Sequence, residues 1–478
     1  MRILSLIVVC LIFGQSLLFS QESYKPEEFL SELIQIKSIT GNENEVGNFV
    51  LEFCKKQGFY TRTFSNDSSF NFSASLYPLE QNKPNIVFLS HLDVVSEGDS
   101  ALWRFSPYSG KIADNFVWGR GAIDCKGLLT MQLLAMQKFI DSVKTENLPY
   151  NVTFLAVSGE ETSTYSGANY VTQNFLHELN PVVVYGEGGS GMYNVVPSKP
   201  EKVIFGISVS EKKALWLKLE ANNKSMGHGA TPPVLYANKK LLKALIKILD
   251  EKRLIKFGKV ARKMFKEIGQ LEGGISGFVM RHIYWDVFWP VVRKNFTEDE
   301  IMHTLVYNTF VITGLYNNEI SGISMASNQI ADKAYAILDC RLLPETNSEK
   351  FIKKLENIVG PQIKITVIEE SPGAEPSDFE NNFYNLLKNS TQEVYPKSEV
   401  IPLLFPATTD NNYFRKYNIP VYGFLPVIFS NEEINSVHNI NEKISINSLY
   451  QGIDVYTKLI SKLMNENSEP KKRRLKLN

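Results

Sequence analysis

The stretch IVFLSHLD, residues 86–93, is the first of three apolar runs that end in chemically active side chains. The other two are VTFLAVSGEE, residues 152–161, and VVVYGEGG, residues 182–189. Runs this short and this rich in Val and Phe predict strands that are buried on both faces. A segment of good helix formers, residues 128–143, lies between the first two runs. Strands that alternate with helices indicate an α/β fold with a mostly parallel sheet flanked by helices.

Outside these runs, the sequence predicts further helices of the main domain and a second, smaller domain. Residues 26–59 have helical spacing, interrupted by a Thr40-Gly41-Asn42 turn. From about residue 202 the pattern changes to strands, helices and an aromatic-rich stretch around Trp285. We therefore expect an α+β domain inserted into the main domain. The predicted segments are a leader (1–20), the first part of the main domain (21–201), the inserted domain (202–370), the second part of the main domain (371–465) and a disordered basic tail (466–478).

The overall composition narrows the class of protein. Of the 478 residues, 44% are hydrophobic and 21% are charged, which is an ordinary globular balance. Lys and Arg number 51, and Asp and Glu also number 51, so the formal net charge is zero. Nucleic-acid binders normally carry a basic excess or a basic stripe. The composition therefore excludes a mainly disordered chain, and we expect no nucleic-acid partner.

The first twenty residues have the layout of a signal peptide. Arg2 precedes an apolar run over residues 3–13, and Ser16 and Ser20 are small residues at candidate cleavage points. We expect an exported protein, periplasmic or secreted, with membrane attachment only if this segment stays uncleaved as an anchor. Three cysteines remain outside the leader, and this small odd number argues against a disulfide framework.

Polar residues that suit metal binding follow each predicted strand. His91 ends the first run, Glu160 and Glu161 follow the second, and Glu187 follows the third. In open α/β sheets, ligands bind beyond the carboxyl ends of the strands, so these side chains should converge there. Asp124 adds a carboxylate at the entry to the predicted helix. Carboxylates gathered without basic partners repel one another unless a cation lies among them, so the pattern predicts a metal site.

His91 and Asp93 are two residues apart, so in an extended segment they point to the same side. We expect His91 to bind the metal and Asp93 to hold the orientation of the imidazole. A single His-x-Asp pair is a weak signal, because most such pairs lie on protein surfaces. Its value here comes from its combination with the other motifs.

Taken together, these motifs resemble metallopeptidase family 20, which includes aminoacylase-1, glutamate carboxypeptidase and yeast carboxypeptidase S. The resemblance covers residues 25–465. The aromatic insertion and LDCRLLP (338–344) are most similar to the carboxypeptidase S branch, which also holds secreted enzymes that hydrolyse or form N-fatty-acyl amino acids. The motifs that carry the resemblance are HLD (91–93), WGRGAIDCKG (118–127), Glu160-Glu161, EGG (187–189) and VHNINE (437–442).

The resemblance implies a two-zinc site within a two-zinc exopeptidase fold. Asp124 would bridge the metals, His91 and Glu187 would complete one site, and Glu161 and His438 would complete the other. Histidine and carboxylate ligands suit Zn²⁺, and Co²⁺ or Mn²⁺ could substitute. Two Zn²⁺ ions, three carboxylates and a bridging hydroxide sum to zero charge, which can be buried.

The resemblance also implies roles for other residues. Glu160 would be the general base that takes a proton from a metal-bridged water as this water attacks an amide carbonyl. The substrates would be N-acyl amino acids or small peptides with a free C-terminal carboxylate. The inserted domain would be a lid and dimerisation domain, so we expect a homodimer. His228, within GHGATPP (227–233), would stabilise the oxyanion, often across the dimer, with a simple turn histidine as the alternative.

Asn328 and Arg341 resemble the substrate-contacting Asn and Arg of the family. An arginine suits a bidentate grip on a free carboxylate, although Arg341 could equally be a structural ion-pair partner. Two motifs depart from the family pattern. Relatives often have an Asp before the third-strand glutamate, where this chain has Gly186, and an Arg where this chain has Asn412. The second departure puts the usual substrate preference in doubt, but not the metal chemistry.

Two other functions stay open at this point. A related two-zinc aminopeptidase would use similar ligands but would need a site for a free amine, and such enzymes commonly lack an inserted lid. A non-catalytic binding protein on the same scaffold would normally have lost the base or a ligand, and none is lost here. The sequence does not define which acyl group or amino acid is preferred.

Overall fold

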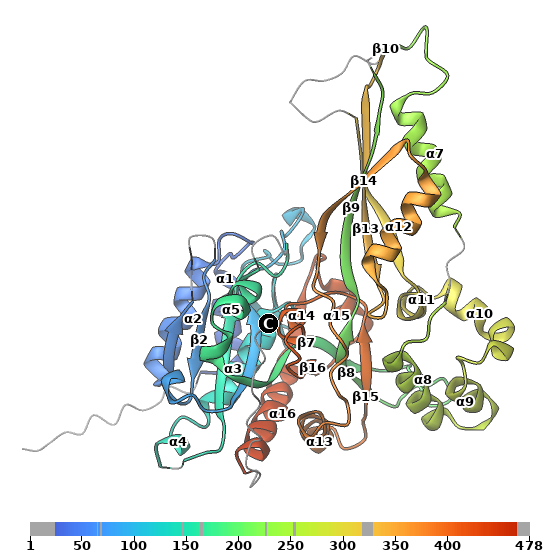
Figure 1. Cartoon of the computed structure of the whole chain (residues 1–478). Helices are drawn as coiled ribbons and strands as arrows, with labels where there is room; N and C mark the ends of the chain where they lie inside the picture. Colours follow the sequence, from blue (N-terminus) through green and yellow to red (C-terminus); the bar gives the residue numbers. More distant parts are fainter. Residues whose placement is uncertain are drawn as a thin grey trace, which may run out of the picture.

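The computed structural model describes residues 24–465, apart from residues 65, 67–68, 146, 163–165, 225–226, 252–254 and 318–327. The predicted signal peptide and basic tail lie outside the described residues. Figure 1 shows a broad body and a narrower lid that rises from it. Within the described part of the chain, no helix is long and apolar enough to cross a membrane.

The body contains an eight-stranded sheet with the strand order β1-β2-β6-β3-β7-β16-β8-β15. The neighbouring pairs β6–β3, β3–β7, β7–β16 and β8–β15 are parallel. β1 and β2 pair antiparallel at one edge, so the sheet is mostly parallel, as predicted. The strands are β1 (Tyr60–Thr63), β2 (Phe72–Ser75), β3 (Asn85–His91), β6 (Asn151–Val157), β7 (Pro181–Met192), β8 (Ile204–Glu211), β15 (Glu399–Phe405) and β16 (Val421–Ile428).

β3 illustrates why continuous apolar runs form the central strands. Ile86 and Phe88 belong to the hydrophobic core on one face of the sheet, and Val87 and Leu89 belong to the core on the other. Successive side chains of a strand point to opposite faces, so a strand covered on both sides needs an unbroken apolar sequence. The first core includes side chains of α1 (Pro26–Gln35), α2 (Asn44–Gln57), α3 (Lys126–Gln137), α13 (Asn382–Val394) and α16 (Ile446–Met464). The second includes those of α5 (Gly167–Asn174), α6 (Leu176–Leu179) and α14 (Asn411–Arg415).

The lid is a four-stranded antiparallel sheet with the order β11-β13-β9-β14. Helices α7 and α12 pack on this sheet around a separate hydrophobic core. Buried and partly exposed residues alternate along β13, as expected for a sheet covered by helices on one face. The predicted inserted α+β domain is therefore confirmed. Its elements are β9 (Lys213–Asn222), α7 (Ala237–Leu249), β11 (Thr309–Asn317), β13 (Lys333–Leu342), α12 (Ser348–Val359) and β14 (Ile363–Glu370).

The segment 202–370 does not fold as one unit, which differs from the predicted domain boundaries. β8 pairs with β15 and β16 in the main sheet and is buried along its whole length. Residues 259–306 form what we call the helical segment, and its first helix joins the core of the body through Val260, Met264 and Phe265. The apolar run of β8 resembles one arm of a hairpin with β9, and only the tertiary pairing separates the two strands. The helical segment contains α8 (Lys259–Glu272), α9 (Gly274–Arg281), η3 (Asp286–Phe288), α10 (Trp289–Glu298) and α11 (Glu300–Val306).

Smaller elements complete the structure. The helix predicted over residues 128–143 ends at Gln137, and Ile140 beyond it turns into the core, where it is buried. β10 and β12 form a two-stranded pairing, and β17, β5 and β4 form a three-stranded sheet. The remaining elements are η1 (Leu79–Gln81), η2 (Ser100–Leu102), β4 (Lys111–Ala113), β5 (Phe116–Trp118), α4 (Ser142–Thr145), β10 (Gly227–His228), β12 (Gln329–Ile330), α15 (Asn431–Ser436) and β17 (Lys443–Ser445).

Candidate metal centre

The sheet brings the residues of the predicted metal site to one edge. His91 is the last residue of β3, Glu160 and Glu161 follow the end of β6, and Glu187 lies within β7. These three strands are parallel neighbours, so their carboxyl ends meet. Asp124 lies just before α3, which packs against β3. The convergence that the sequence predicts is therefore present in the structure.

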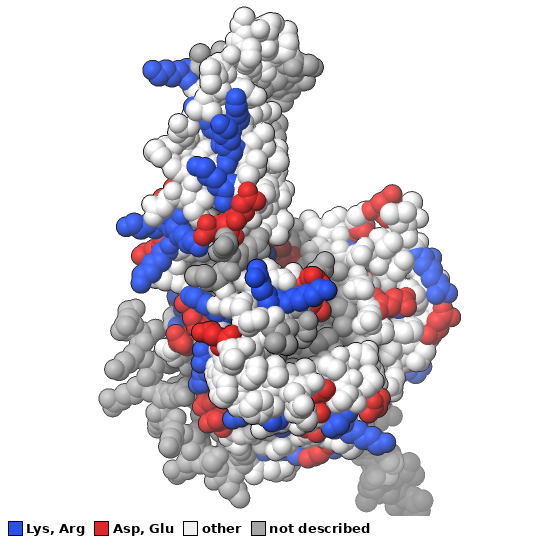
Figure 2. All heavy atoms as spheres, turned by 90° about the vertical axis from the view of Figure 1, so that its right-hand side faces the viewer, with Lys and Arg blue, Asp and Glu red and all other residues white. Residues whose placement is uncertain are grey.

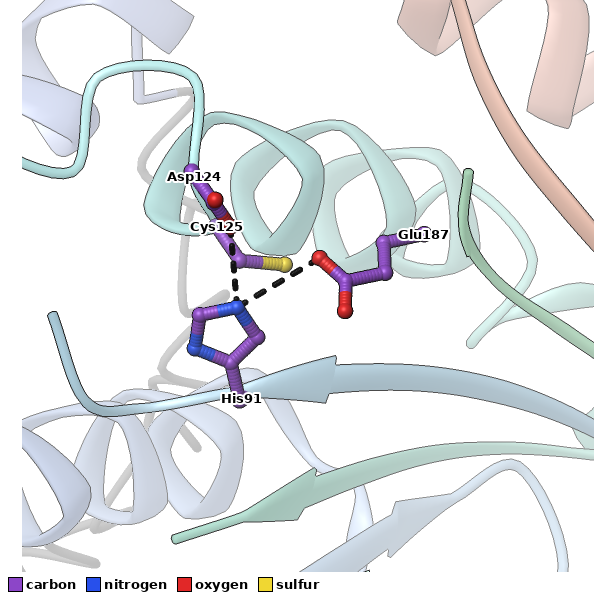
Figure 3. Close-up of side chains that lie close together, drawn as sticks. All are labelled: His91, Asp124, Cys125 and Glu187. Atoms are coloured by element: carbon purple, nitrogen blue, oxygen red, sulfur yellow. Dashed lines mark hydrogen bonds and ion pairs between the residues drawn. The ribbon is translucent and has the colours of Figure 1, made fainter. Parts of the chain in front are cut away.

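The first group of candidate ligands surrounds His91. Its Nε2 lies 3.0 Å from Asp124 Oδ1 and 3.5 Å from Glu187 Oε2. Figure 3 shows the imidazole facing both carboxylates, with the sulfur of Cys125 beside them. The candidate ligand atoms of these four residues lie within 4.8 Å of one another, which is close enough for a single ion to contact them. Cys125 lies within the quoted motif 118–127 but was assigned no role, because a cysteine after Asp124 carries no signal of its own.

The second group shares Asp124 with the first. His438 Nε2 lies 3.1 Å from Asp124 Oδ2 and 3.1 Å from Glu161 Oε2, and these three residues also lie within 4.8 Å of one another. Asp124 therefore presents one oxygen to each histidine. This is the arrangement that a carboxylate bridging two ions requires.

The electrostatics of the centre favour bound cations. Burial and nearby carboxylates raise the pKa of Glu187 to about 7 and that of Glu160 well above its usual range. Hydrogen bonds with Asp124 and Glu161 raise the pKa of His438 to about 10. Glu161 Oε1 is also buried without a hydrogen-bond partner. Acids that are forced toward protonation and an orphaned carboxylate oxygen are the features that metal ions would relieve, so the donor set fits a pair of divalent ions.

Asp93 supports the centre in two ways. Its backbone oxygen lies 2.9 Å from His91 Nδ1, which places the proton on Nδ1 and leaves Nε2 to face Asp124. Its carboxylate accepts hydrogen bonds from the backbone N–H groups of Gly159, Glu160 and Glu161 at 3.0, 3.2 and 3.1 Å. The Asp93 backbone oxygen is thus the nearer partner of His91 Nδ1, with the carboxylate Oδ1 at 3.5 Å, while the same carboxylate fixes the turn that carries the two glutamates.

Glu442 supports the loop that carries Asp124. Its fully buried carboxylate accepts hydrogen bonds from the backbone N–H groups of Gly121, Ile123 and Asp124 at 3.0, 2.8 and 3.1 Å. Arg120 Nη1 donates to the same carboxylate at 2.7 Å. Glu442 ends the VHNINE motif (437–442), but the motif predicts no role for it. The two charged residues are far apart in the chain, so only their shared burial reveals the connection.

The start of α14 and the Asp410 that precedes it pack against the centre. Asn411 Nδ2 donates to the backbone oxygen of Glu187 at 2.8 Å, and Ser166 Oγ donates to Asp410 at 3.0 Å. Burial raises the pKa of Asp410 to about 8. Asn412 stands where relatives often have an arginine, and its oxygen accepts a hydrogen bond from Arg415 at 3.0 Å.

The charge of Arg415 is already neutralised in the core. The guanidinium lies 3.3 Å from Glu211, and both side chains are buried. Arg415 therefore does not replace the missing arginine as a surface-accessible cation.

The remaining predicted site residues lie away from the metal-binding groups. His228 is on β10, which Figure 1 places at the far tip of the lid. Asn328 Nδ2 lies 3.1 Å from His228 Nε2, and both side chains are exposed. The sequence assigned these two residues separate roles, and the structure places them side by side at the lid tip, away from the sheet edge.

Arg341 is engaged by residues of the lid and the body. Its Nε and Nη2 donate to the two carboxylate oxygens of Asp339 at 2.9 and 3.1 Å. Nη1 lies 3.3 Å from Thr408 Oγ1, in the loop that follows β15. The structural ion pair that the sequence analysis kept as an alternative is therefore formed, and it places the guanidinium at the junction of the lid and the body.

Comparisons with known proteins agree with this geometry. The sequence profile of "Peptidase family M20/M25/M40" matches residues 87–462. The "N-fatty-acyl-amino acid synthase/hydrolase PM20D1" of Bos taurus is 26% identical over 448 residues, which cover 90% of this chain and 86% of that protein. The "Probable carboxypeptidase S-like 2" of Dictyostelium discoideum is 23% identical, with 90% of this chain and 83% of that protein covered.

A solved structure shows the same fold. The M20 family metallo-carboxypeptidase Sso-CP2 from Sulfolobus solfataricus superposes with a TM-score of 0.69 at 18% identity, covering 92% of this chain and 99% of that chain. The predicted resemblance to metallopeptidase family 20 is confirmed by the profile match, and the similarity to the carboxypeptidase S and N-fatty-acyl-amino-acid branch by the relatives. This chain belongs to the peptidase family M20/M25/M40.

Proposed function

We propose that the protein is a two-zinc amidohydrolase that cleaves N-acyl amino acids or small peptides with a free C-terminal carboxylate. The observation that carries the proposal is the pair of ligand groups sharing Asp124. Glu160 directly precedes Glu161, a ligand of the second group, in the sequence. His91 and Glu187 would hold one ion, with Cys125 close by. Glu161 and His438 would hold the other. The metal could be Zn²⁺, Co²⁺ or Mn²⁺ by ligand type.

In this proposal Glu160 transfers the proton. Bound metal ions in such a site polarise the amide carbonyl and lower the pKa of water. Glu160 takes a proton of the attacking water and returns it to the leaving nitrogen, so that one water is consumed and a carboxylic acid and an amine are formed, which then ionise in water. The hydrogen bond from its backbone N–H to Asp93 holds it beside Glu161, the candidate ligand.

We also propose that the protein acts as a homodimer, in which His228 and Asn328 of one chain serve the centre of the other. Within one chain the two residues are exposed at the lid tip, where a partner could meet them. An apolar stripe on α7 supports a lid-mediated contact: Leu242, Ile246 and Leu249 are all about half exposed and lie on one side of the helix. Among the described strands, β11 also lies at an open edge of the lid sheet.

The acyl side of the substrate is proposed to be apolar, as in the relatives that act on N-fatty-acyl amino acids. Arg341 is the candidate contact for the free carboxylate, because it stands at the junction of lid and body and is about one third exposed. Cleavage of the leader and export to the periplasm or the medium complete the proposal, in keeping with the composition of residues 1–20.

The proposal is tested by amino-acid release from mixed N-acyl amino acids and dipeptides, with and without a chelator. Chelator-sensitive release from N-acylated substrates is the expected result. Cleavage of unblocked peptides alone would favour an aminopeptidase and overturn the substrate assignment. A protein that binds no metal and releases nothing would be a binding protein on this scaffold, and the proposal would fail.

A further inference from the structure

The helical segment exposes an apolar surface that the proposed active site does not use. Ile275 and Val287 are 85% and 71% exposed, and Phe278, Tyr284 and Trp285 are each exposed by more than a third. These five residues of α9, the turn that follows it and η3 are here called the aromatic surface. Figure 2 looks onto this side of the molecule and shows a broad uncharged area at the height of the helical segment, below the lysines and arginines of the lid. Exposed apolar patches of this kind usually mark an interaction site.

The rings of the aromatic surface support one another. Phe278 packs on His282, His282 packs on Trp285, and the rings of Trp285 and Phe288 are stacked with centroids 6.0 Å apart. Such a connected cluster keeps large side chains fixed in an exposed position. Solvent exposure of a pre-ordered apolar cluster is unfavourable unless a partner covers it.

A cavity of about 360 Å³ opens beside these rings. Its walls include Tyr284, Trp285 and Trp289, together with two cations, Lys256 and Arg262. The Arg262 guanidinium lies 4.8 Å from the centre of the Tyr284 ring. Two acids, Asp286 and Glu345, line the same cavity. Cations and acids are thus present in equal number next to an aromatic wall.

This combination fits a zwitterionic lipid headgroup. Arg and Lys are the natural partners of a phosphate, and an aromatic wall with nearby carboxylates is the natural partner of a quaternary ammonium. Trp and Tyr favour the membrane–water interface, and the protruding Ile275 and Val287 could enter the acyl region beyond it. A second copy of the chain is a poorer occupant, because the dimer contact proposed above uses the lid.

We propose that the aromatic surface docks the protein on the surface of a lipid bilayer, with a phosphocholine-type headgroup in the adjoining cavity. This docking goes beyond the proposed hydrolysis and would place the enzyme where amphipathic acyl substrates partition. In this proposal the charged residues of the cavity contribute to binding by contacting one zwitterionic headgroup, and not by forming a basic patch that attracts anionic lipids. Binding should therefore be as strong on zwitterionic as on anionic vesicles.

The test uses vesicles of brominated phosphatidylcholine, which quench the fluorescence of tryptophan side chains that enter the bilayer. The full chain should show a quenched component that is absent from the Trp285→Phe variant. Vesicle affinity, read from the quenching titration, should fall at least ~10-fold in an Ile275→Ser/Val287→Ser variant, since it loses two inserted aliphatic side chains. Because all variants share the same N-terminus, whether or not residues 1–20 are cleaved, these differences report the aromatic surface and not the leader.

Three further measurements keep the proposal falsifiable. Asp286→Lys, which changes an exposed residue, should weaken binding to phosphatidylcholine more than binding to phosphatidylglycerol. Val367→Ser/Ile368→Ser, a matched loss of exposed apolar side chains on β14 of the lid, should leave the quenching unchanged. Glu160→Gln should bind vesicles like the unmodified chain, so that a failure of the hydrolysis proposal is distinguishable from a failure of this one. Equal quenching in Trp285→Phe, or binding that requires phosphatidylglycerol, would overturn the inference.

Discussion

The metal centre and the tip of the lid hold predicted site residues of similar chemical types, but the fold places them very differently. His91 is buried at the end of a central strand, and its Nε2 is 3.0 Å from Asp124. His228 is exposed on a two-residue strand, and its described side-chain partner is Asn328, at 3.1 Å. The first histidine belongs to an arrangement that one chain completes by itself. The second can act as a catalytic group only if it contacts the metal centre of another chain. The role of a buried residue can therefore be inferred from one chain, whereas the role of this exposed histidine depends on a partner.

Replacement of Glu160 in the metal centre should have the largest effect on catalytic activity. Glu160→Gln removes the proposed proton acceptor but keeps the size of the side chain, so kcat should fall about 10²–10⁴-fold. Metal content, measured by elemental analysis, should not change. The neighbouring Glu161→Gln is the matched control, because it should lose metal as well as activity. Full activity of Glu160→Gln would contradict the assigned role.

Two arginines allow the stability contribution of a buried ion pair to be compared with that of a partly exposed one. Arg415→Met should lower the free energy of unfolding by about 3–5 kcal/mol, because Glu211 would stay buried without its cation. Arg341→Met should lower it by about 1 kcal/mol or less, since its pairing with Asp339 is partly solvated. Denaturant titration measures both values. If Arg341 contacts the substrate carboxylate, its replacement should also raise KM. Equal losses of stability in the two variants would contradict the difference between the buried and the partly exposed ion pair.

His228 tests whether the lid tip serves a second chain. His228→Ala should lower kcat about 10²–10³-fold, the usual effect of losing one oxyanion donor, with the metal content unchanged. Mixing this variant with Glu160→Gln should restore activity in hybrid dimers, where one centre has both groups intact. No recovery on mixing, in a preparation shown to contain hybrid dimers, would exclude action across the dimer.

Replacement of Glu442 tests whether its hydrogen bonds to the Asp124 loop support metal binding. Glu442→Gln turns one acceptor oxygen into a donor that faces backbone N–H groups of the Asp124 loop, so metal affinity should fall about 10–100-fold. Competition with a chromophoric chelator measures this change. Glu432→Gln, on exposed α15, is the control and should bind metal normally. Unchanged affinity in Glu442→Gln would mean that the loop is held by other contacts.

The sequence predicts most of the buried structure, for physical reasons that particular residues show. The run 86–89 is apolar at every position because β3 has a core on each face, so both the strand and the placement of His91 could be inferred. The helix predicted over residues 26–59 with one turn corresponds to α1 and α2. These features depend on local pattern and on burial, which a sequence records directly.

Other features depend on tertiary contacts that no local pattern records. β8 resembles the start of the lid, but its pairing with β15 and β16 places it in the body. Glu442 and Arg120 are separated by more than 300 residues, and their contact appears only when the three-stranded sheet around β5 and β17 forms. The sequence left Arg341 with two equally acceptable roles, a contact to the substrate carboxylate or a structural ion pair. Its hydrogen bond to Asp339 shows that the ion pair forms.

The number of metal ions bound per chain shows whether Asp124 is shared by two sites. The purified chain, loaded with zinc and freed of excess, should hold two ions per chain by elemental analysis, because Asp124 offers one oxygen to each ligand group. His438→Ala should hold a single ion, since it dismantles only the second group. A chain that binds no zinc, or a His438→Ala variant that still binds two ions, would contradict the account of a shared carboxylate between two metal sites.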